Sequence, residues 1–225
     1  MKIPHSFKIS IIQKFLRNEI TEERTYFALT LLTGVAAGLI AVSIKSLTHY
    51  LTNLIGTNTA FTMESTLFGG LLVLISGILT TRFFPSTSGS GIPGVRVSLA
   101  VYHGKIKLGS SIAKYITSIL SLASGISLGR EGPTVAISSG IGSYLGHLFA
   151  LSKKRVKALV AIGSAGGIAA AFNTPIAAVV FTLEEIVGDL NAKVLGAIVI
   201  SSVVASVTAS ALQGGDNSLF SVLDY

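Results

Sequence analysis

The strongest constraint on this chain is the absence of charge over long stretches of its sequence. Asp, Glu, Lys and Arg are missing from residues 25–44, 65–81, 115–129, 132–152, 158–183 and 194–215. A helix needs about 20 apolar residues to cross a bilayer, and the first, second and last of these intervals meet that requirement. The chain is therefore predicted to be an all-α, multi-pass membrane protein.

Composition excludes the main soluble classes. Only 12% of the residues are charged, against about 25% in an average soluble domain, which argues against an ordinary soluble enzyme. The net charge of +7 is better explained by lipid headgroups or an anionic cargo than by nucleic acid. Cysteine is absent and no metal-ligand or catalytic motif is present, so we expect no metal, no cofactor and no enzymatic activity.

The middle intervals do not predict simple spanning rods. Interval 115–129 is short, and interval 158–183 is broken by Asn173-Thr174-Pro175. Together with 24 glycines, these breaks favour closely packed, broken and re-entrant helices. Glycine pairs spaced four apart are expected to let helices approach closely; they are Gly34 with Gly38, Gly142 with Gly146, and Gly163 with Gly167.

The N-terminal segment, residues 1–23, differs from the rest. Its Ile, Phe and Leu residues are interleaved with Lys8, Lys14 and Arg17, which predicts an amphipathic helix lying on a membrane surface rather than a secretory signal. A soluble helix capping the bundle fits the pattern equally well. Residues 24–225 form the expected transmembrane domain.

The first unusual motif is Gly89-Ser90-Gly91-Ile92-Pro93. Glycines leave backbone N–H groups accessible, the serine adds a hydroxyl, and proline favours the first turn of a new helix. A helix N-terminus with free N–H groups is suited to anions. An ordinary polar turn between two membrane helices accounts for the spacing equally well.

The second motif, Gly129-Arg130-Glu131-Gly132-Pro133, places charge inside apolar sequence. If its flanks are embedded, Arg130 and Glu131 lie at membrane depth, where a central charge costs about 2.5–3.5 kcal/mol on insertion scales. Pro133 favours a helix start, so Glu131 would face the positive end of that helix. We interpret Glu131 as a functional carboxylate where a mobile anion could also bind; the alternative is a capping residue in a surface loop.

The third motif combines Phe172-Asn173-Thr174-Pro175 with Glu184-Glu185. The proline restarts a helix, and the acidic pair closes that helix about ten residues later. Carboxylates at a helix C-terminus oppose the macrodipole, so helix stability does not explain them. A solvated pair at the membrane–water boundary remains the alternative.

In order and spacing, the three motifs resemble the CLC family of chloride channels and chloride/proton antiporters. The resemblance covers nearly the whole chain but only the first half of a usual family member. It implies one inverted-topology repeat of a CLC-type fold and chloride transport across a membrane. It also implies a multi-pass location, expected to be the cell (inner) membrane.

The resemblance also implies roles for the motif residues. Gly89, Ser90, Gly91, Ile92 and Pro93 would hold the central chloride, with serine typical of chloride-preferring members rather than of the fluoride-exporting branch. Glu131, within its motif, would be the external gate that competes with chloride and carries a proton. Glu185, beside Glu184, would be the internal proton relay, and having both carboxylates favours exchange over passive conduction. The alternatives are a passive channel and a non-conducting fragment or assembly module.

A single repeat would hold half of an ion path. The missing half could belong to a longer protein, to a separate second-half chain, or to a second copy packed antiparallel. On the family topology, residues 82–114 would be cytoplasmic and Lys153–Lys157 would lie on the other side. That weak charge bias slightly favours a self-assembling, dual-topology half.

Overall fold

The computed structural model describes residues 19–56, 62–188 and 192–213. These residues form helices and no β-strand. The elements are α2 (Glu19–Ile55), α3 (Met63–Ile78), η1 (Leu79–Phe83), η2 (Pro85–Thr87), α4 (Ile92–Ala100), α5 (Leu108–Ala123), α6 (Glu131–Leu148), α7 (Lys153–Phe172), α8 (Pro175–Phe181), η3 (Thr182–Val187) and α9 (Ala192–Leu212). The expected surface helix lies outside the described residues except for its last five, which begin α2, so its division from the rest stays a prediction.

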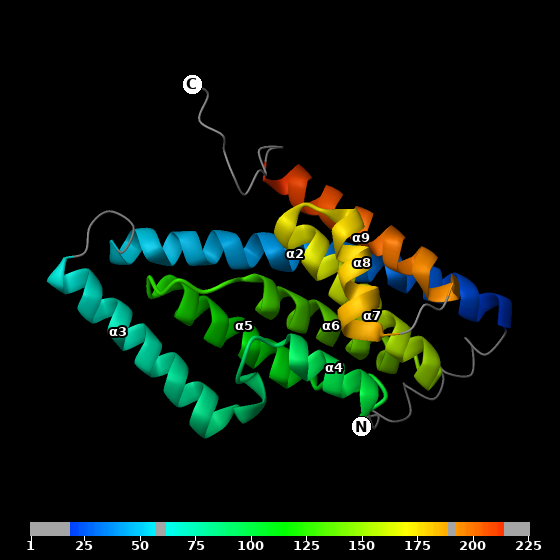
Figure 1. Ribbon diagram of the computed structural model, residues 1–225, viewed down its shortest axis with the longest axis horizontal. Helices are drawn as coiled ribbons and strands as arrows, with labels where there is room; N and C mark the ends of the chain where they lie inside the picture. Colours follow the sequence, from blue (N-terminus) through cyan, green and yellow to red (C-terminus); the bar gives the residue numbers. More distant parts are fainter. Residues whose placement is uncertain (1–18, 57–61, 189–191, 214–225) are drawn as a thin grey trace, which may run out of the picture.

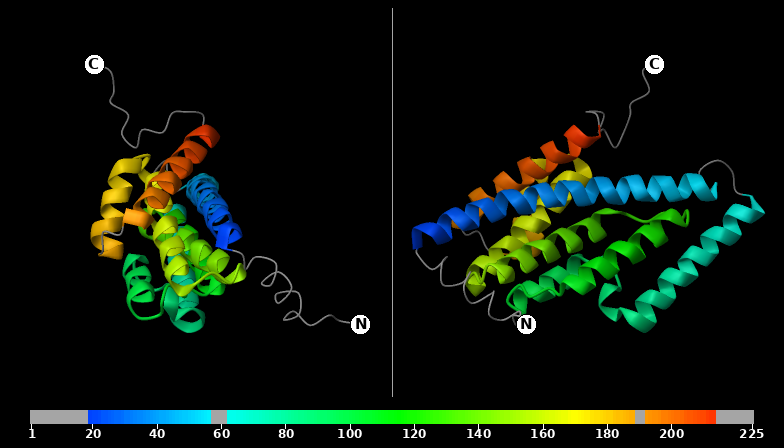
Figure 2. Two further views of the ribbon diagram at one scale, coloured as in Figure 1. Left: turned by 90° about the vertical axis from the view of Figure 1, so that its right-hand side faces the viewer. Right: turned by 180° about the vertical axis from the view of Figure 1, so that it is seen from behind.

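Helix α7 is the centre of the bundle, with α2, α6 and α9 packed around it (Figure 1). Its apolar span is 83% buried within the structure, whereas that of α3, continued through η1, is 17% buried. Leu159 and Ile162 of α7 are fully buried and form a core with Leu29 of α2 and Ile198 of α9. Figure 2 shows α3 diverging from the other helices, which explains its low burial.

Small residues set the closest helix contacts. A Cβ at Gly34 would lie 2.9 Å from the Ser201 carbonyl oxygen of α9, and a Cβ at Gly163 would collide with the Ser138 carbonyl of α6. The Ser139 and Ser164 hydroxyls bond at 2.7 Å across the α6–α7 interface. The predicted packing role of the spaced glycines is therefore confirmed.

The membrane-crossing candidates match the charge-free intervals. Within the described part of the chain, four helices are long and apolar enough to cross a bilayer: Glu23–Ile55, Met63–Phe83, Lys153–Phe172 and Val194–Leu212. Three of them confirm the intervals read as simple spans. The other, α7, occupies the N-terminal side of the predicted break.

The break after α7 has a clear local cause. Asn173 takes a left-handed conformation with φ 57° and ends α7, and Pro175 begins α8. The Asn173 Oδ1 atom accepts hydrogen bonds from the hydroxyls of Ser206 and Ser210 on α9. The predicted interruption is confirmed, and Asn173 fixes it by tying the turn to a neighbouring helix.

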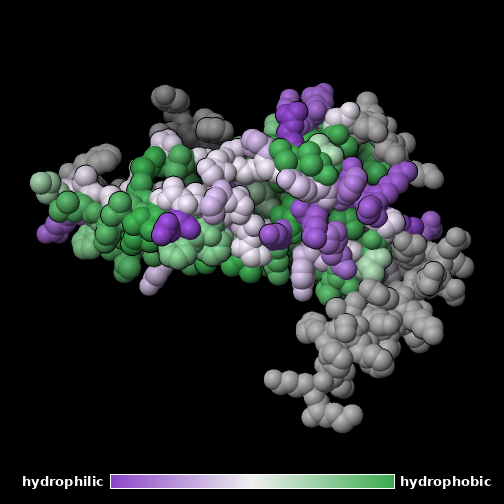
Figure 3. Space-filling view, turned by 90° about the horizontal axis from the view of Figure 1, so that it is seen from below, coloured by the Kyte–Doolittle hydropathy of each residue, from purple (hydrophilic) through white to green (hydrophobic). Residues whose placement is uncertain are grey.

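The expected separation of the basic segments is wrong. Arg96, Lys154 and Lys157 line one cavity, and a Cβ at Gly104 would lie 3.2 Å from the Lys157 Cα atom. These segments meet because α4 and the turn after it pack against the N-terminal end of α7. Figure 3 shows hydrophilic side chains gathered toward the right-hand end of the molecule. The basic residues of these two segments therefore lie at the same end of the described structure.

Candidate functional site

The first motif forms a tight loop that leads into α4. Gly89 and Gly91 have φ values of 77° and 105°, a region that favours glycine. Gly91 is the N-cap of α4, and Pro93 lies in the first helical turn as predicted. The loop thus delivers Ser90 to the N-terminal end of a helix, where backbone N–H groups have no intrahelical partner.

The second motif begins α6. The helix starts at Glu131, with Arg130 as its N-cap, two residues before the expected start at Pro133. Glu131 therefore belongs to the first turn, where a carboxylate is favoured by the helix dipole. The Glu131 carboxylate folds back over Gly129, where a Cβ would collide with it.

The structure brings these two motifs together. A Cβ at Gly132 would overlap the Ser90 carbonyl oxygen, and a Cβ at Gly91 would lie 2.9 Å from the Gly132 carbonyl oxygen. Glycine on both sides allows the Ser90 loop to rest directly on the first turn of α6. Two helix N-termini, those of α4 and α6, consequently converge on one place.

A cavity of about 570 Å³ lies at this convergence. It is lined by Gly89, Ser90 and Ile92 from the first motif and by Gly129, Glu131, Gly132 and Pro133 from the second. Gly91, Pro93 and Arg130 are absent from its lining. Hydroxyl groups from Ser76, Thr80, Thr117, Ser118 and Ser121 also line it. Converging helix N-termini and hydroxyl-bearing residues attract an anion. Because few fully charged groups surround the site, the anion is held weakly enough to leave again.

Lys114 on α5 is a site residue that the sequence reasoning missed. Only 9% of it is exposed, and its ammonium donates to the carbonyl oxygens of Thr87 and Gly89 at 2.8 and 2.5 Å. It also lines the cavity. Its hydrogen bonds hold the Ser90 loop from behind, and its charge adds to the positive potential of the site. The available signal was a single lysine at the border of interval 115–129.

Replacing Lys114 with Met is expected to weaken both the fold and anion binding. The carbonyl group of the buried Thr87 would lose its donor, and an unsatisfied buried group costs about 1–3 kcal/mol. We expect a lower melting temperature and weaker protection by chloride in thermal unfolding of the purified chain. Lys153→Met is the matched control, because Lys153 is exposed at the start of α7. Equal melting temperatures and equal protection by chloride in the two variants would contradict the proposal that Lys114 anchors the Ser90 loop.

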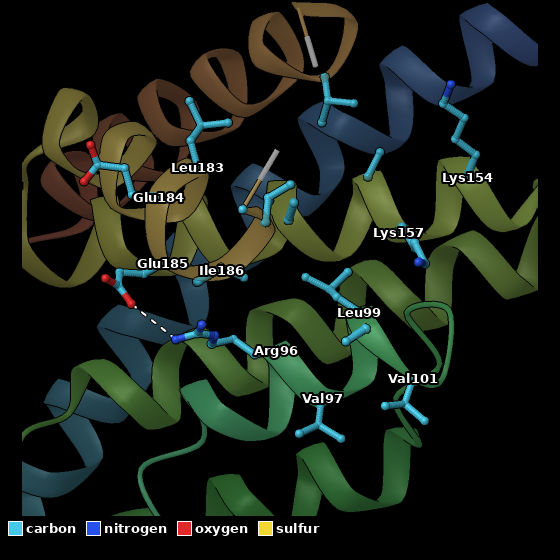
Figure 4. A pocket seen from close by; sticks show the side chains of 16 residues that line it. Arg96, Val97, Leu99, Val101, Lys154, Lys157, Leu183, Glu184, Glu185 and Ile186 are labelled. Carbon is cyan, nitrogen blue, oxygen red and sulfur yellow. Dashed lines mark hydrogen bonds and ion pairs between the residues drawn. The ribbon is translucent and has the colours of Figure 1, made fainter. Parts of the chain in front are cut away.

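The acidic pair of the third motif, Glu184 and Glu185, lies at a different cavity, of about 590 Å³ (Figure 4). Glu184 and Glu185 belong to η3, a π-helical continuation of α8 that the sequence did not predict. The Glu185 Oε2 atom forms an ion pair with Arg96 of α4 at 3.3 Å. Figure 4 shows the Glu184 carboxylate pointing away from that pair. The structure therefore separates Glu185 from Ser90 and Glu131.

Comparison with known proteins identifies the family. A family model described as voltage gated chloride channel matches residues 69–224. The chain belongs to the CLC family of voltage-gated chloride channels. With four candidate membrane spans, this CLC chain is an integral, multi-pass membrane protein.

Curated relatives in the CLC family are transporters and channels. The chain is 30% identical over 234 residues to the H(+)/Cl(−) exchange transporter ClcA of Vibrio cholerae serotype O1, covering 96% of this chain and 50% of that protein. It is 35% identical over 149 residues to a probable chloride channel protein of Mycosarcoma maydis, covering 64% of this chain and 13% of that protein. The chain thus spans about half the length of the ClcA relatives it matches.

Solved CLC structures share the fold. A slow cyanobacterial Cl−/H+ antiporter matches with a TM-score of 0.72 at 24% identity, over 84% of this chain and 47% of that one. A CLC-type fluoride/proton antiporter matches with a TM-score of 0.74 at 24% identity, over 93% of this chain and 52% of that one. The predicted fold class, an all-α membrane protein with broken helices and one CLC-type repeat, is confirmed.

Proposed function

We propose that this chain moves chloride across a membrane in exchange for protons, as part of a complete CLC-type transport unit. One observation carries the proposal: the Ser90 loop rests on the first turn of α6, so that Ser90 and Glu131 line the same cavity. Antiport by the ClcA relatives supports it. In this proposal Gly89, Ser90, Gly91, Ile92 and Pro93 form the chloride-binding loop, and the segment from Gly129 to Pro133 forms the gate.

The mechanism follows from competition for one positive site. The deprotonated Glu131 carboxylate and a chloride ion are both attracted by the N-termini of α4 and α6, and they repel one another. Protonation of Glu131 removes its charge and allows it to leave the anion path, so that chloride can enter. Deprotonation returns the carboxylate to the site and displaces chloride. This mutual exclusion couples opposite movements of the two ions.

Glu185, with Glu184 beside it, is the proposed proton relay on the other face of α4. Both residues line a cavity that also contains Lys154 and Lys157, and both are exposed, so protons from water can reach them. A passive chloride channel is the second candidate function. The Arg96–Glu185 ion pair favours it, since it gives Glu185 a structural role, joining η3 to α4, that requires no proton transfer.

Replacing Glu185 with Gln is expected to reduce proton flux by about tenfold while chloride flux continues, because the amide cannot carry the proton. Glu184→Gln should have a smaller effect, since of the two carboxylates it is Glu185 that contacts α4, the helix that begins at the Ser90 loop. Proton and chloride fluxes in proteoliposomes measure both variants. Undiminished coupling in Glu185→Gln would reject Glu185 as the relay, whereas chloride flux without proton flux in the unmodified chain would favour the passive channel.

The second half of the path is proposed to come from outside these 225 residues. Ser90 is exposed, and Glu131 is half-buried, which leaves the cavity open for another surface to complete. The rest of a longer protein, a separate second-half chain or a second copy could supply that surface within the lipid bilayer. Because the basic segments lie at one end of the molecule, a distinct second half whose own sequence sets the inverted orientation fits better than dual insertion of identical copies.

Reconstitution of the purified chain tests the function directly. Chloride and proton fluxes are measured together in vesicles of known lipid composition, with the chain alone and after co-expression with candidate second halves. Stoichiometric proton movement against chloride supports exchange. Chloride movement without protons supports the passive channel. Absence of both with every partner would reject transport by this chain.

A further inference from the structure

A second cavity, of about 580 Å³, lies on the other side of the Ser90 loop. It is bounded by α4, by the turn that follows α4 and by the N-terminal end of α5. Lys105, Lys107 and Lys114 line it, and no Asp or Glu does among the described residues. Three ammonium groups without a facing carboxylate are an unusual wall for a cavity, and they create a positive potential inside it.

The backbone that presents the lysines is anchored. The Ile106 N–H donates to the Ser143 Oγ atom at 2.9 Å, and that hydroxyl donates to the Gly104 carbonyl oxygen at 2.7 Å. Gly104, with φ 80°, packs against Lys157 at the start of α7. Lys105 and Lys107 are the two neighbours of Ile106 in the sequence, so these hydrogen bonds also fix the backbone position of both lysines. The cavity is a preformed feature of the fold.

The cavity also contains hydrogen-bond donors. The Ser110 and Ser111 N–H groups at the start of α5 donate to the Lys107 carbonyl oxygen, so the donors available to a ligand are side-chain groups. The Ser86 and Ser110 hydroxyls meet at 3.0 Å in its wall. The Ser111 hydroxyl does not contribute, because it faces Gly140 of α6, where an added Cβ would collide with it.

We propose that this cavity, here called the lysine cavity, binds a phosphate group, either free or on a lipid head. A tetrahedral anion with several oxygens can accept bonds from two lysines and from hydroxyls at once, and charge-assisted bonds are the strong ones. Chloride is a single small ion, and in a cavity of this size it could not contact all of these groups at once.

The lysine cavity adjoins the proposed chloride site. Thr87, Ser88 and Lys114 line both cavities. A phosphate group in one would share the Lys114 charge with an anion in the other and would repel it. Bound phosphate therefore inhibits chloride transport, a consequence that rests on the proposed function. Phosphate binding itself does not depend on transport.

Calorimetric titration of the purified full chain in a maltoside detergent and gluconate buffer tests binding. The probes are inorganic phosphate and dihexanoyl phosphatidic acid, which separate the free anion from the lipid head. Wild type is expected to bind at least one probe saturably, with affinity falling as ionic strength rises. Lys105→Gln combined with Lys107→Gln should weaken binding by about tenfold or more, and Lys153→Gln should leave it unchanged.

The outcomes separate the possibilities. Binding of the lipid alone assigns the site to a headgroup, and binding of inorganic phosphate assigns it to the free anion. No binding of either probe, or equal binding by the double variant, would overturn the proposal. Gel filtration and thermal melting check the fold; should the double variant be unstable, Lys105→Gln and Lys107→Gln are titrated singly. Phosphate inhibition of chloride flux, lost in the variant, tests the consequence separately.

Discussion

Replacement of Glu131 by Ala is expected to abolish coupled proton movement while chloride flux persists. Glu131 is the one carboxylate that lines the Ser90 cavity among the described residues, so its removal takes away both the proposed proton carrier and the competitor of chloride. The site keeps its helix N-termini, its hydroxyls and Lys114, and it still attracts an anion. Simultaneous recording of external chloride and pH around proteoliposomes measures both fluxes.

The matched control for this experiment is Glu64→Ala. Glu64 lies in the first turn of α3 and is exposed, so it is chemically equal to Glu131 but remote from the cavity. We expect this control to behave as wild type in both fluxes. Proton transport that continues unchanged in Glu131→Ala would sink the assignment of this residue as gate and proton carrier.

Replacement of Gly132 by Ala is expected to displace the Ser90 loop and to reduce chloride affinity by about tenfold or more. The added methyl group would overlap the Ser90 carbonyl oxygen and approach the Ser90 Cβ atom to 3.2 Å. Because the obstacle is backbone, no rotamer change relieves it, and overpacking of this kind costs about 1–3 kcal/mol. The gain in helix propensity from Gly to Ala, about 1 kcal/mol, offsets only part of that cost.

Gly94→Ala provides the comparison. Gly94 lies two residues beyond Ile92 in α4, and nothing lies within 4 Å of a Cβ placed there. The control should retain or slightly raise the melting temperature and should keep its chloride affinity. Chloride titration followed by intrinsic tyrosine fluorescence or calorimetry distinguishes the two variants. Equal affinities would show that the contact between the loop and α6 does not shape the site.

The helical architecture could be predicted because its causes are local. Long charge-free runs locate α2, α3 and α9, and the Asn173–Pro175 break is encoded by a left-handed residue followed by a proline. The π-helical form of η3 was not predictable from these patterns, because residues 182–187 contain no glycine or proline that would mark a change from α8. The side of the membrane occupied by Lys153–Lys157 was also missed, since it depends on packing between distant segments.

The candidate site also contains both residues that the sequence predicted and residues that it did not. The loop and the α6 start carry local signals, glycine and proline at fixed offsets, and these predicted Ser90 and Glu131 as special positions. Lys114 and Arg96 carry no such signal, because their importance comes from partners far away in the sequence. Lys114 bonds to carbonyls 25 and 27 residues earlier, and Arg96 meets a carboxylate 89 residues later. Contacts of this range require the folded chain.

The short helix α4 joins two places that are otherwise separate. Its N-terminal end is pressed against Gly132 and Ala136 of α6, next to Ser90, and Arg96, little more than one turn further on, holds Glu185. A nine-residue helix is stiff on this scale. Any displacement of the Ser90 loop would therefore also displace Arg96 and disturb its ion pair with Glu185.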